Sequence, residues 1–201
     1  CNTKGYRVKY WGDGNETFWH SVRTAREYAA LVNVYARAMK AVDPDILSSA
    51  NGHWDIQMTG NKGRTPLDYR EKAKKVLLEA TDKKQTAALT REVKEVIVKD
   101  ITAGDEKWWE NVADICGENI DMISIHWYYH REKHPDITRK IKEVKELFAR
   151  KYPRKEFLVC LSEYNCNDSH INQRIPGFVE GIGRFLEVGI DIGNFWPMRI
   201  R

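Results

Sequence analysis

Apolar and polar residues alternate along this chain with two different periodicities. Short apolar runs rich in β-branched and aromatic residues predict strands, and longer stretches with apolar residues three or four positions apart predict helices. The predicted strands are residues 6–11, 46–50, 122–127, 156–163 and 190–196. The predicted helices between them are residues 24–43, 108–116, 141–148 and 174–188.

The first of these helices carries clear signals at both ends. Thr24 and Glu27 have the spacing of a capping box, and Pro44 ends the helix just after Asp43. The apolar face predicted for this helix consists of Tyr28, Val32, Tyr35, Met39 and Val42.

Strands that alternate with helices predict an α/β fold with parallel strands and crossover helices. Either a barrel or a doubly wound sheet satisfies this pattern, but no Gly-x-Gly-x-x-Gly or Walker loop opens any predicted helix. We therefore expect a partial (β/α)8 TIM barrel, because a whole one takes about 250 residues. Residues 1–201 are predicted to form a single catalytic-type domain, and the polar segment 53–104 a helical insertion within it, with helices at 67–80 and 86–101.

The composition of the chain limits the classes of partner that we expect it to bind. The 33 basic and 29 acidic residues are interleaved, so the net charge of +4 gives no strong footprint for nucleic acid. No apolar run approaches the length of a membrane span. The four cysteines, Cys1, Cys116, Cys160 and Cys166, have no Cys-x-x-Cys pair and are interpreted as buried or incidental thiols. The chain begins with Cys1, so we expect the natural N-terminus upstream, and both a cytoplasmic and a secreted location stay open.

Two glutamates at the ends of predicted strands carry the functional prediction. Glu16 and Glu163 are expected to share one cleft, because the C-terminal ends of parallel strands meet on one face of a barrel. Cleavage of a glycosidic bond needs one protonated and one ionised carboxyl group, whose pKa values must therefore differ. Tyr128 and Tyr164 are available to donate hydrogen bonds that hold one carboxylate ionised.

Several segments resemble glycoside hydrolases of clan A. The segment 9–16, ending in Gly14-Asn15-Glu16, resembles the clan's fourth strand with its acid/base, and 162–165, Ser-Glu-Tyr-Asn, resembles the seventh strand with its nucleophile. The segment 38–44 is similar to the clan's fourth helix running into the fifth strand, and 121–128 looks like the sixth strand with its His-x-Tyr. The resemblance is nearest to the α-L-arabinofuranosidases of family 51 or the xylosidases of family 39.

This resemblance implies a retaining glycoside hydrolase that cleaves terminal or internal bonds of plant-type polysaccharide or oligosaccharide and is arabinofuranosidase-like. Glu16 would be the acid/base and Glu163 the nucleophile. The implied substrate-binding residues are Asn15, which would bond the sugar 2-hydroxyl, and His126, Tyr128, Tyr164 and Trp196. The expected partner is a carbohydrate. We expect no nucleic-acid partner, no membrane association and no cofactor, and the oligomeric state is open.

Metal is not expected. His126, His130 and His134 are spaced as ligands on a helix would be, but Pro135 and the preceding strand argue against that helix.

The chain departs from the clan pattern in two places. Gly12-Asp13-Gly14 puts an aspartate in a usually apolar slot and loosens the strand end. The clan's first three strands have no counterpart in this chain. Two alternatives therefore stay open: a non-catalytic carbohydrate-binding homologue or inactive fragment of the same fold, and a basic helical interaction module around residues 67–107.

Overall fold

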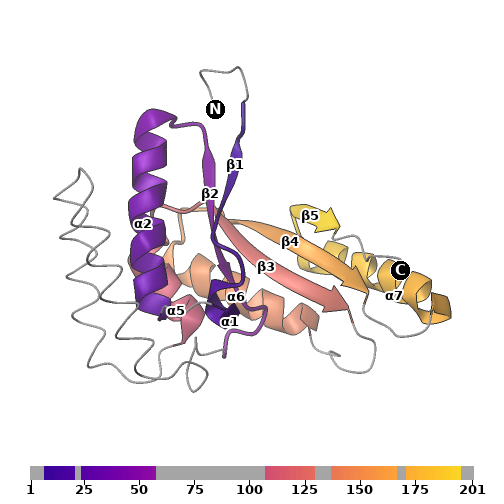
Figure 1. The fold of residues 1–201 in the computed structure, drawn as a ribbon. Helices are drawn as coiled ribbons and strands as arrows, with labels where there is room; N and C mark the ends of the chain where they lie inside the picture. The colour runs from indigo at the N-terminus through magenta and orange to yellow at the C-terminus, as the bar shows by residue number, and fades with distance from the viewer. Residues whose placement is uncertain (1–6, 21–23, 58–106, 130–136, 167–170, 196–201) are drawn as a thin grey trace.

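A computed structural model describes residues 7–20, 24–57, 107–129, 137–166 and 171–195 (Figure 1). In this part of the chain, parallel strands form one sheet whose spatial order is the chain order, β1-β2-β3-β4-β5. The strands are β1 (Tyr10–Asp13), β2 (Leu47–Gly52), β3 (Met122–Tyr129), β4 (Leu158–Cys166) and β5 (Ile192–Phe195). The helices are α1 (Thr17–His20), α2 (Ala25–Val42), α5 (Trp108–Cys116), α6 (Ile137–Lys151) and α7 (Ile171–Val188).

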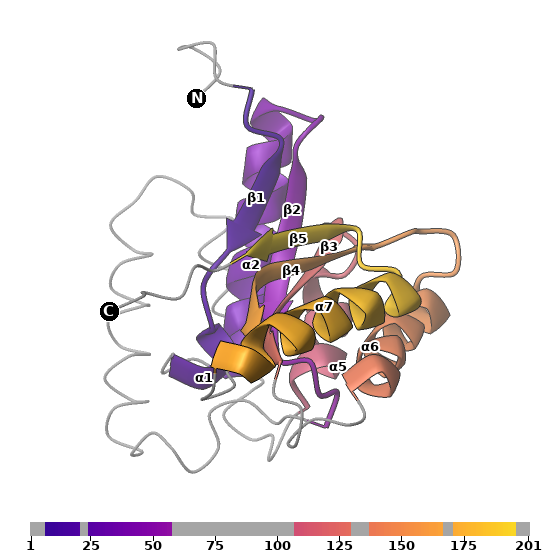
Figure 2. The same ribbon diagram turned by 90° about the vertical axis from the view of Figure 1, so that its right-hand side faces the viewer.

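The five strands curl as half of a barrel, and α2, α5, α6 and α7 cover the outer face (Figures 1 and 2). Each strand is followed by at least one helix before the next strand begins, as right-handed crossovers require. Because all strands are parallel, their C-terminal ends lie together at one rim of the half-barrel. The predicted partial barrel is confirmed.

The strand boundaries differ from the predicted ones, and the first strand differs most. The prediction placed it at residues 6–11, whereas among the described residues, which begin at 7, the paired segment is Tyr10–Asp13, from Tyr10 opposite Leu47 to Asp13 opposite Ala50. The apolar run ends at Trp11, but pairing with the neighbouring strand continues through Gly12 and Asp13. Backbone pairing, which side-chain hydropathy does not report, therefore sets this boundary.

Helix α2 begins as predicted. Thr24 Oγ1 accepts the N–H of Glu27 at 3.2 Å, and the Glu27 carboxylate accepts the N–H of Thr24 at 2.7 Å. The predicted apolar face is wrong in its second half, because Tyr35 is 53% exposed and Val42 85% exposed. Burial follows instead the small and apolar residues Ala25, Tyr28, Ala29, Val32 and Ala36, which let α2 approach α5 closely.

The core lies between the outer face of the sheet and these helices. Trp108 and Trp109 of α5 are fully buried there, and each indole N–H has a backbone acceptor: the Asn51 carbonyl at 2.9 Å and the His53 carbonyl at 2.5 Å. A Cβ on Gly52 would lie 2.4 Å from a ring carbon of Trp109. The end of β2 therefore approaches α5 as closely as it does because residue 52 has no side chain.

The described cysteines match their prediction. Cys116, Cys160 and Cys166 are buried thiols, and burial raises the pKa of the Cys160 thiol to about 11 and that of Cys116 further. Cys1 and the insertion predicted at 53–104, apart from residues 53–57, lie outside the described residues. Among the described helices, none combines the length and the apolar character that crossing a membrane requires.

The contact between Gly52 and α5 gives a test of the fold. We expect Gly52→Ala to lower the free energy of unfolding by about 1–3 kcal/mol, because the new methyl group overpacks against two buried indoles. Gly183→Ala is the control: it lies in α7, where a Cβ meets nothing within 4 Å, and is expected to stabilise the protein by up to about 1 kcal/mol. Urea unfolding followed by tryptophan fluorescence measures both, and equal stability of the two variants would contradict this packing.

Candidate functional site

The turn that follows β1 has an unusual backbone. Gly14 has a φ of 89° and Glu16 a φ of 44°, and Glu16 is the one non-glycine residue with positive φ in the described part of the chain. This conformation costs a non-glycine residue about 1–2 kcal/mol. It brings the Glu16 carboxylate to the rim of the half-barrel, where Oε1 lies 3.1 Å from Nδ1 of His126 on β3.

Glu163 reaches the same place by a β-bulge in β4. Ile125 pairs with Leu161, but the next residue of β3, His126, pairs with Glu163, so that Ser162 is an additional residue in β4. Leu161 points into the core under the helices, and strict alternation would turn Glu163 to that same side. The bulge turns Glu163 to the inner face instead, beside His126.

These side chains form a compact cluster. Nδ1 of His126 lies 3.5 Å from Oε2 of Glu163, and one ligand atom each of Glu16, His126 and Glu163 lie within 4.8 Å of one another. The hydroxyl of Tyr128 donates to Oε2 of Glu163 at 2.6 Å. The side chains of His126, Glu163 and Glu16 are 8%, 16% and 28% exposed, so the cluster is shielded but open to a ligand.

The environment of Tyr128 keeps it a hydrogen-bond donor. Burial raises the pKa of its hydroxyl, and the hydrogen bond to Glu163 and the charges of Glu163 and Glu16 raise it further. A phenol that stays protonated keeps its O–H available to the neighbouring carboxylate oxygen. The site therefore contains one carboxylate with a dedicated phenol donor, Glu163, and one that faces His126 from a turn, Glu16.

The remaining predicted site residues are placed differently. Asn15 is exposed beside Glu16 in the turn, and Trp196 lies outside the described residues. Tyr164 follows the bulge and points away from the cluster to the outer face, where its ring stacks on Phe178 and packs edge-on against Phe185 and Phe195. The structure thus brings Glu16, His126, Tyr128 and Glu163 together and leaves Tyr164 apart from them.

Sequence reasoning did not single out the polar residues beneath this cluster. The hydroxyls of Ser124 and Ser162 lie 2.7 Å apart on neighbouring strands, below His126 and Glu163. Asn51, at the end of β2, bonds both ends of the turn that carries Glu16. The signal that could have found these residues is a polar side chain inside a strand that is otherwise buried. Ser124 and Asn51 are both polar residues of this kind.

The cluster also contains the donor set of a divalent cation. Two carboxylates and one imidazole, from Glu16, Glu163 and His126, form the one group of potential metal ligands among the described residues. Hydrogen bonds and ion pairing among these side chains also account for their proximity. His130 and His134, the other members of the histidine series, lie outside the described residues.

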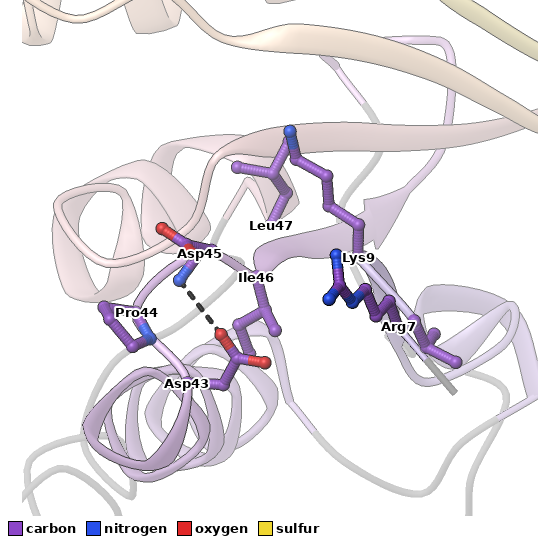
Figure 3. A pocket seen from close by; sticks show the side chains of 8 residues that line it. Arg7, Lys9, Asp43, Pro44, Asp45, Ile46 and Leu47 are labelled. Carbon is purple, nitrogen blue, oxygen red and sulfur yellow. Dashed lines mark hydrogen bonds between the residues drawn. The ribbon is translucent and has the colours of Figure 1, made fainter. Parts of the chain in front are cut away.

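A cavity lies away from this cluster, at the opposite end of the strands (Figure 3). Its volume is about 880 Å³, and it is lined by residues 7–9, which precede β1, by the turn 43–46 after α2 and by Leu47 of β2. In that turn Asp43 accepts the backbone N–H of Asp45 at 3.2 Å. Basic and acidic side chains are mixed here, and barrels place their chemistry at the C-terminal strand ends, so the cluster around His126 is the stronger candidate site.

Comparison with known proteins gives relatives in structure alone. No protein-family model matches the sequence, and no curated protein matches it. An α-L-arabinofuranosidase from Thermotoga maritima, solved with arabinose, superposes with a TM-score of 0.56 at 20% identity, covering 96% of this chain and 34% of its own. The family 51 arabinofuranosidase from Xanthomonas axonopodis pv. citri gives 0.56 at 16% identity, covering 96% of this chain and 37% of its own.

A third structure, the family 51 α-L-arabinofuranosidase from Thermotoga petrophila, gives a TM-score of 0.53 at 21% identity and covers 94% of this chain and 34% of its own. The chain thus spans about a third of the length of these structures. At such identities the match shows the fold alone, a partial (β/α)8 barrel like the corresponding part of these structures.

Asp13, three residues before Glu16, is a partly buried carboxyl group on the outer side of β1. Its Oδ2 accepts the hydroxyl of Ser48 at 2.6 Å. Burial raises the pKa of Asp13 from 3.8 to about 6, although the hydrogen bond from Ser48 lowers it in part. This is the aspartate that departs from the apolar pattern of the clan's fourth strand.

The shifted pKa of Asp13 predicts how stability depends on pH. The folded state binds this proton more tightly than the unfolded state, so the contribution of Asp13 is lost as the pH rises from 3.8 to about 6. We expect Asp13→Asn, which can still accept from Ser48, to remove this loss. Unfolding free energies of both proteins between pH 3.5 and 7, in roughly half-unit steps, measure it. If the difference in unfolding free energy between the two proteins stays constant across this range, the raised pKa of Asp13 is contradicted.

Proposed function

We propose that this chain carries the catalytic pair of a retaining glycoside hydrolase, and that the enzyme is arabinofuranosidase-like. The observation that carries the proposal is the convergence of Glu16 and Glu163 on His126, from the turn after β1 and from the C-terminal half of β4. Two carboxylates on one rim of such a barrel are what hydrolysis of a glycosidic bond needs. The fold shared with glycoside hydrolases supports the same reaction.

The distance between the carboxylates supports retention of configuration. An oxygen of Glu16 and an oxygen of Glu163 lie within 4.8 Å. Retaining enzymes hold their carboxyl groups about 5–5.5 Å apart, whereas inverting enzymes leave about 6.5–9.5 Å for a water molecule. The closer spacing favours direct attack by one carboxylate on the anomeric carbon.

The surroundings of each carboxylate assign its role. Glu163, ionised and held by the Tyr128 hydroxyl, attacks the anomeric carbon and forms the glycosyl-enzyme. Glu16 gives its proton to the departing oxygen in this step and takes a proton from water in the next, when the glycosyl bond to Glu163 breaks. Nδ1 of His126 lies 3.1 Å from Oε1 of Glu16 and 3.5 Å from Oε2 of Glu163, so it supports one carboxylate of the pair at a time with a hydrogen bond.

The substrate we propose is an α-L-arabinofuranosyl or related pentosyl unit on a plant-type polysaccharide or oligosaccharide. The solved arabinofuranosidase in complex with arabinose is one of the structures that this chain resembles. Asn15, exposed next to Glu16, is placed to reach a sugar hydroxyl, and His126 and Tyr128 line the same rim. Tyr164 holds β4 against α7 in this proposal, and Trp196 stays a prediction.

Substitution of each glutamate tests the proposal. We expect Glu163→Gln to abolish hydrolysis of 4-nitrophenyl α-L-arabinofuranoside, because the nucleophile is lost. Glu16→Gln is expected to lower kcat by about 10²–10⁴-fold, the usual contribution of a general acid–base. The assay belongs on the longest polypeptide that carries this chain, because the chain spans about a third of its structural relatives.

Glu187→Gln is the matched control, since this exposed glutamate lies on α7 away from the rim. It is expected to leave kcat unchanged. Equal rates in the wild type and Glu163→Gln would contradict the enzymatic proposal.

A non-catalytic carbohydrate-binding homologue is the second candidate. The altered approach at Gly12-Asp13-Gly14 and the left-handed backbone of Glu16 favour it, because both change the strand end that carries the acid/base. Calorimetric titration with arabino-oligosaccharides separates the candidates. Binding by the wild type without any release of sugar supports the second, whereas sugar release that Glu163→Gln removes supports the first.

A further inference from the structure

We propose that Asn51 is a positioning residue: its side-chain amide clamps both ends of the turn that carries Glu16 and so fixes the carboxylate of Glu16 against His126. Asn51 lies at the end of β2, one strand away from Glu16. It contributes no group to the acid–base cluster. The catalytic consequence of the clamp rests on the proposed function, while the clamp itself is a property of the folded chain.

The amide of Asn51 bonds the backbone on both sides of Glu16. Its Oδ1 accepts the N–H of Thr17, the residue after Glu16, at 3.1 Å. Its Nδ2 donates to the carbonyl of Asp13, three residues before Glu16, at 2.8 Å. One planar group therefore fixes the distance between the two ends of the turn Gly14-Asn15-Glu16.

Tyr28 of α2 completes the clamp from the helix side. Its hydroxyl donates to the same Asp13 carbonyl at 2.7 Å and accepts the backbone N–H of Asn51 at 2.7 Å and its Nδ2 at 2.9 Å. Asn51, Tyr28 and Thr17 are all buried. In such an interior a donor or acceptor that loses its partner has no water to replace it, so these bonds hold their geometry firmly.

The turn is also packed too tightly to take another path. A Cβ on Gly14 would lie 2.5 Å from the Thr17 hydroxyl and 3.0 Å from Nδ2 of Asn51, and Gly14 itself has a φ of 89°. Only glycine fits at this position. The clamp and Gly14 together define the path of the backbone into Glu16.

Glu16 needs such a constraint because its own backbone is strained. A glutamate at a φ of 44° persists only where the surrounding structure holds it there. If the amide clamp is broken, the backbone at Glu16 is free to return to negative φ, which swings the side chain away from Nδ1 of His126. Asn51 thus acts on Glu16 through the backbone of the turn and not through the Glu16 carboxylate.

Asn51→Asp tests the clamp with a side chain of the same shape. The aspartate still accepts the N–H of Thr17, but an oxygen replaces the Nδ2 that donates to the Asp13 carbonyl. We expect kcat for arabinofuranosides with poor leaving groups, such as methyl or unsubstituted phenyl, to fall about 10²-fold, the cost of misplacing a catalytic group by about 1 Å.

The pattern across leaving groups separates positioning from general damage. Formation of the glycosyl-enzyme from a 2,4-dinitrophenyl arabinofuranoside needs no proton from Glu16, so we expect this step, measured as a burst, to change less than threefold, about 0.7 kcal/mol. A steeper dependence of rate on leaving-group pKa, matching that of Glu16→Gln, supports the clamp. An equal loss for both kinds of leaving group would overturn it.

Asn119→Asp provides a matched control. Nδ2 of Asn119 donates to Oδ1 of Asn33 at 2.7 Å, so the same substitution creates the same lesion, two oxygens facing each other, before the N-terminal end of β3. We expect Asn119→Asp to lower thermal stability and to leave the leaving-group dependence of the wild type unchanged.

A crystal structure of Asn51→Asp decides the question independently of activity. We expect Glu16 to leave the positive-φ region and its 3.1 Å contact with His126 to lengthen. A Glu16 that keeps both would overturn the clamp. If instead the wild type hydrolyses no arabinofuranoside, the proposed function fails while this structural test still stands.

Discussion

The site depends first on the pairing of β3 with β4. Up to Ile125 the two strands pair residue by residue, and both send apolar side chains under the helices. The additional residue Ser162 then advances β4 by one position, which turns Glu163 toward His126 and Tyr164 toward the aromatic rings of α7. A one-residue change of register exchanges the faces of all side chains beyond it, so the same bulge serves both the cluster and the packing behind it.

A second constraint acts on the other side of the cluster. Glu16 does not lie within a strand but in a turn with positive φ at two of its residues. Nothing in this turn has apolar surface that would hold it in place by burial, and its geometry comes from hydrogen bonds to Asn51 and Tyr28. The two carboxylates are therefore held by different means, one by strand register and one by a buried polar network.

These two constraints order the rim through contacts within the described sheet itself. The described strands form part of a (β/α)8 barrel, and the solved arabinofuranosidases that share this fold are about three times longer than this chain. The proposed nucleophile and acid/base both lie within this part. Their relative position is fixed by contacts among β1, β2, β3 and β4, which are all described.

The sequence by itself determined the order of the elements, the capping box of α2 and the two glutamates whose carboxylates meet. Each of these follows from local patterns, such as hydrophobic periodicity, the spacing of cap residues and short motifs. It did not determine the end of β1, the exposed second half of the predicted face of α2, or the direction of Tyr164.

Only the tertiary structure decided how the site residues face one another. Three features require a partner that is distant in sequence. The bulge at Ser162 sets Glu163 opposite His126, and the clamp of Asn51 bonds Thr17 and Asp13. The left-handed backbone of Glu16 depends on that clamp. The periodicity of one strand contains no information about its register with the next. The sequence therefore predicted which carboxylates meet, and the pairing of neighbouring strands decided which faces they meet on.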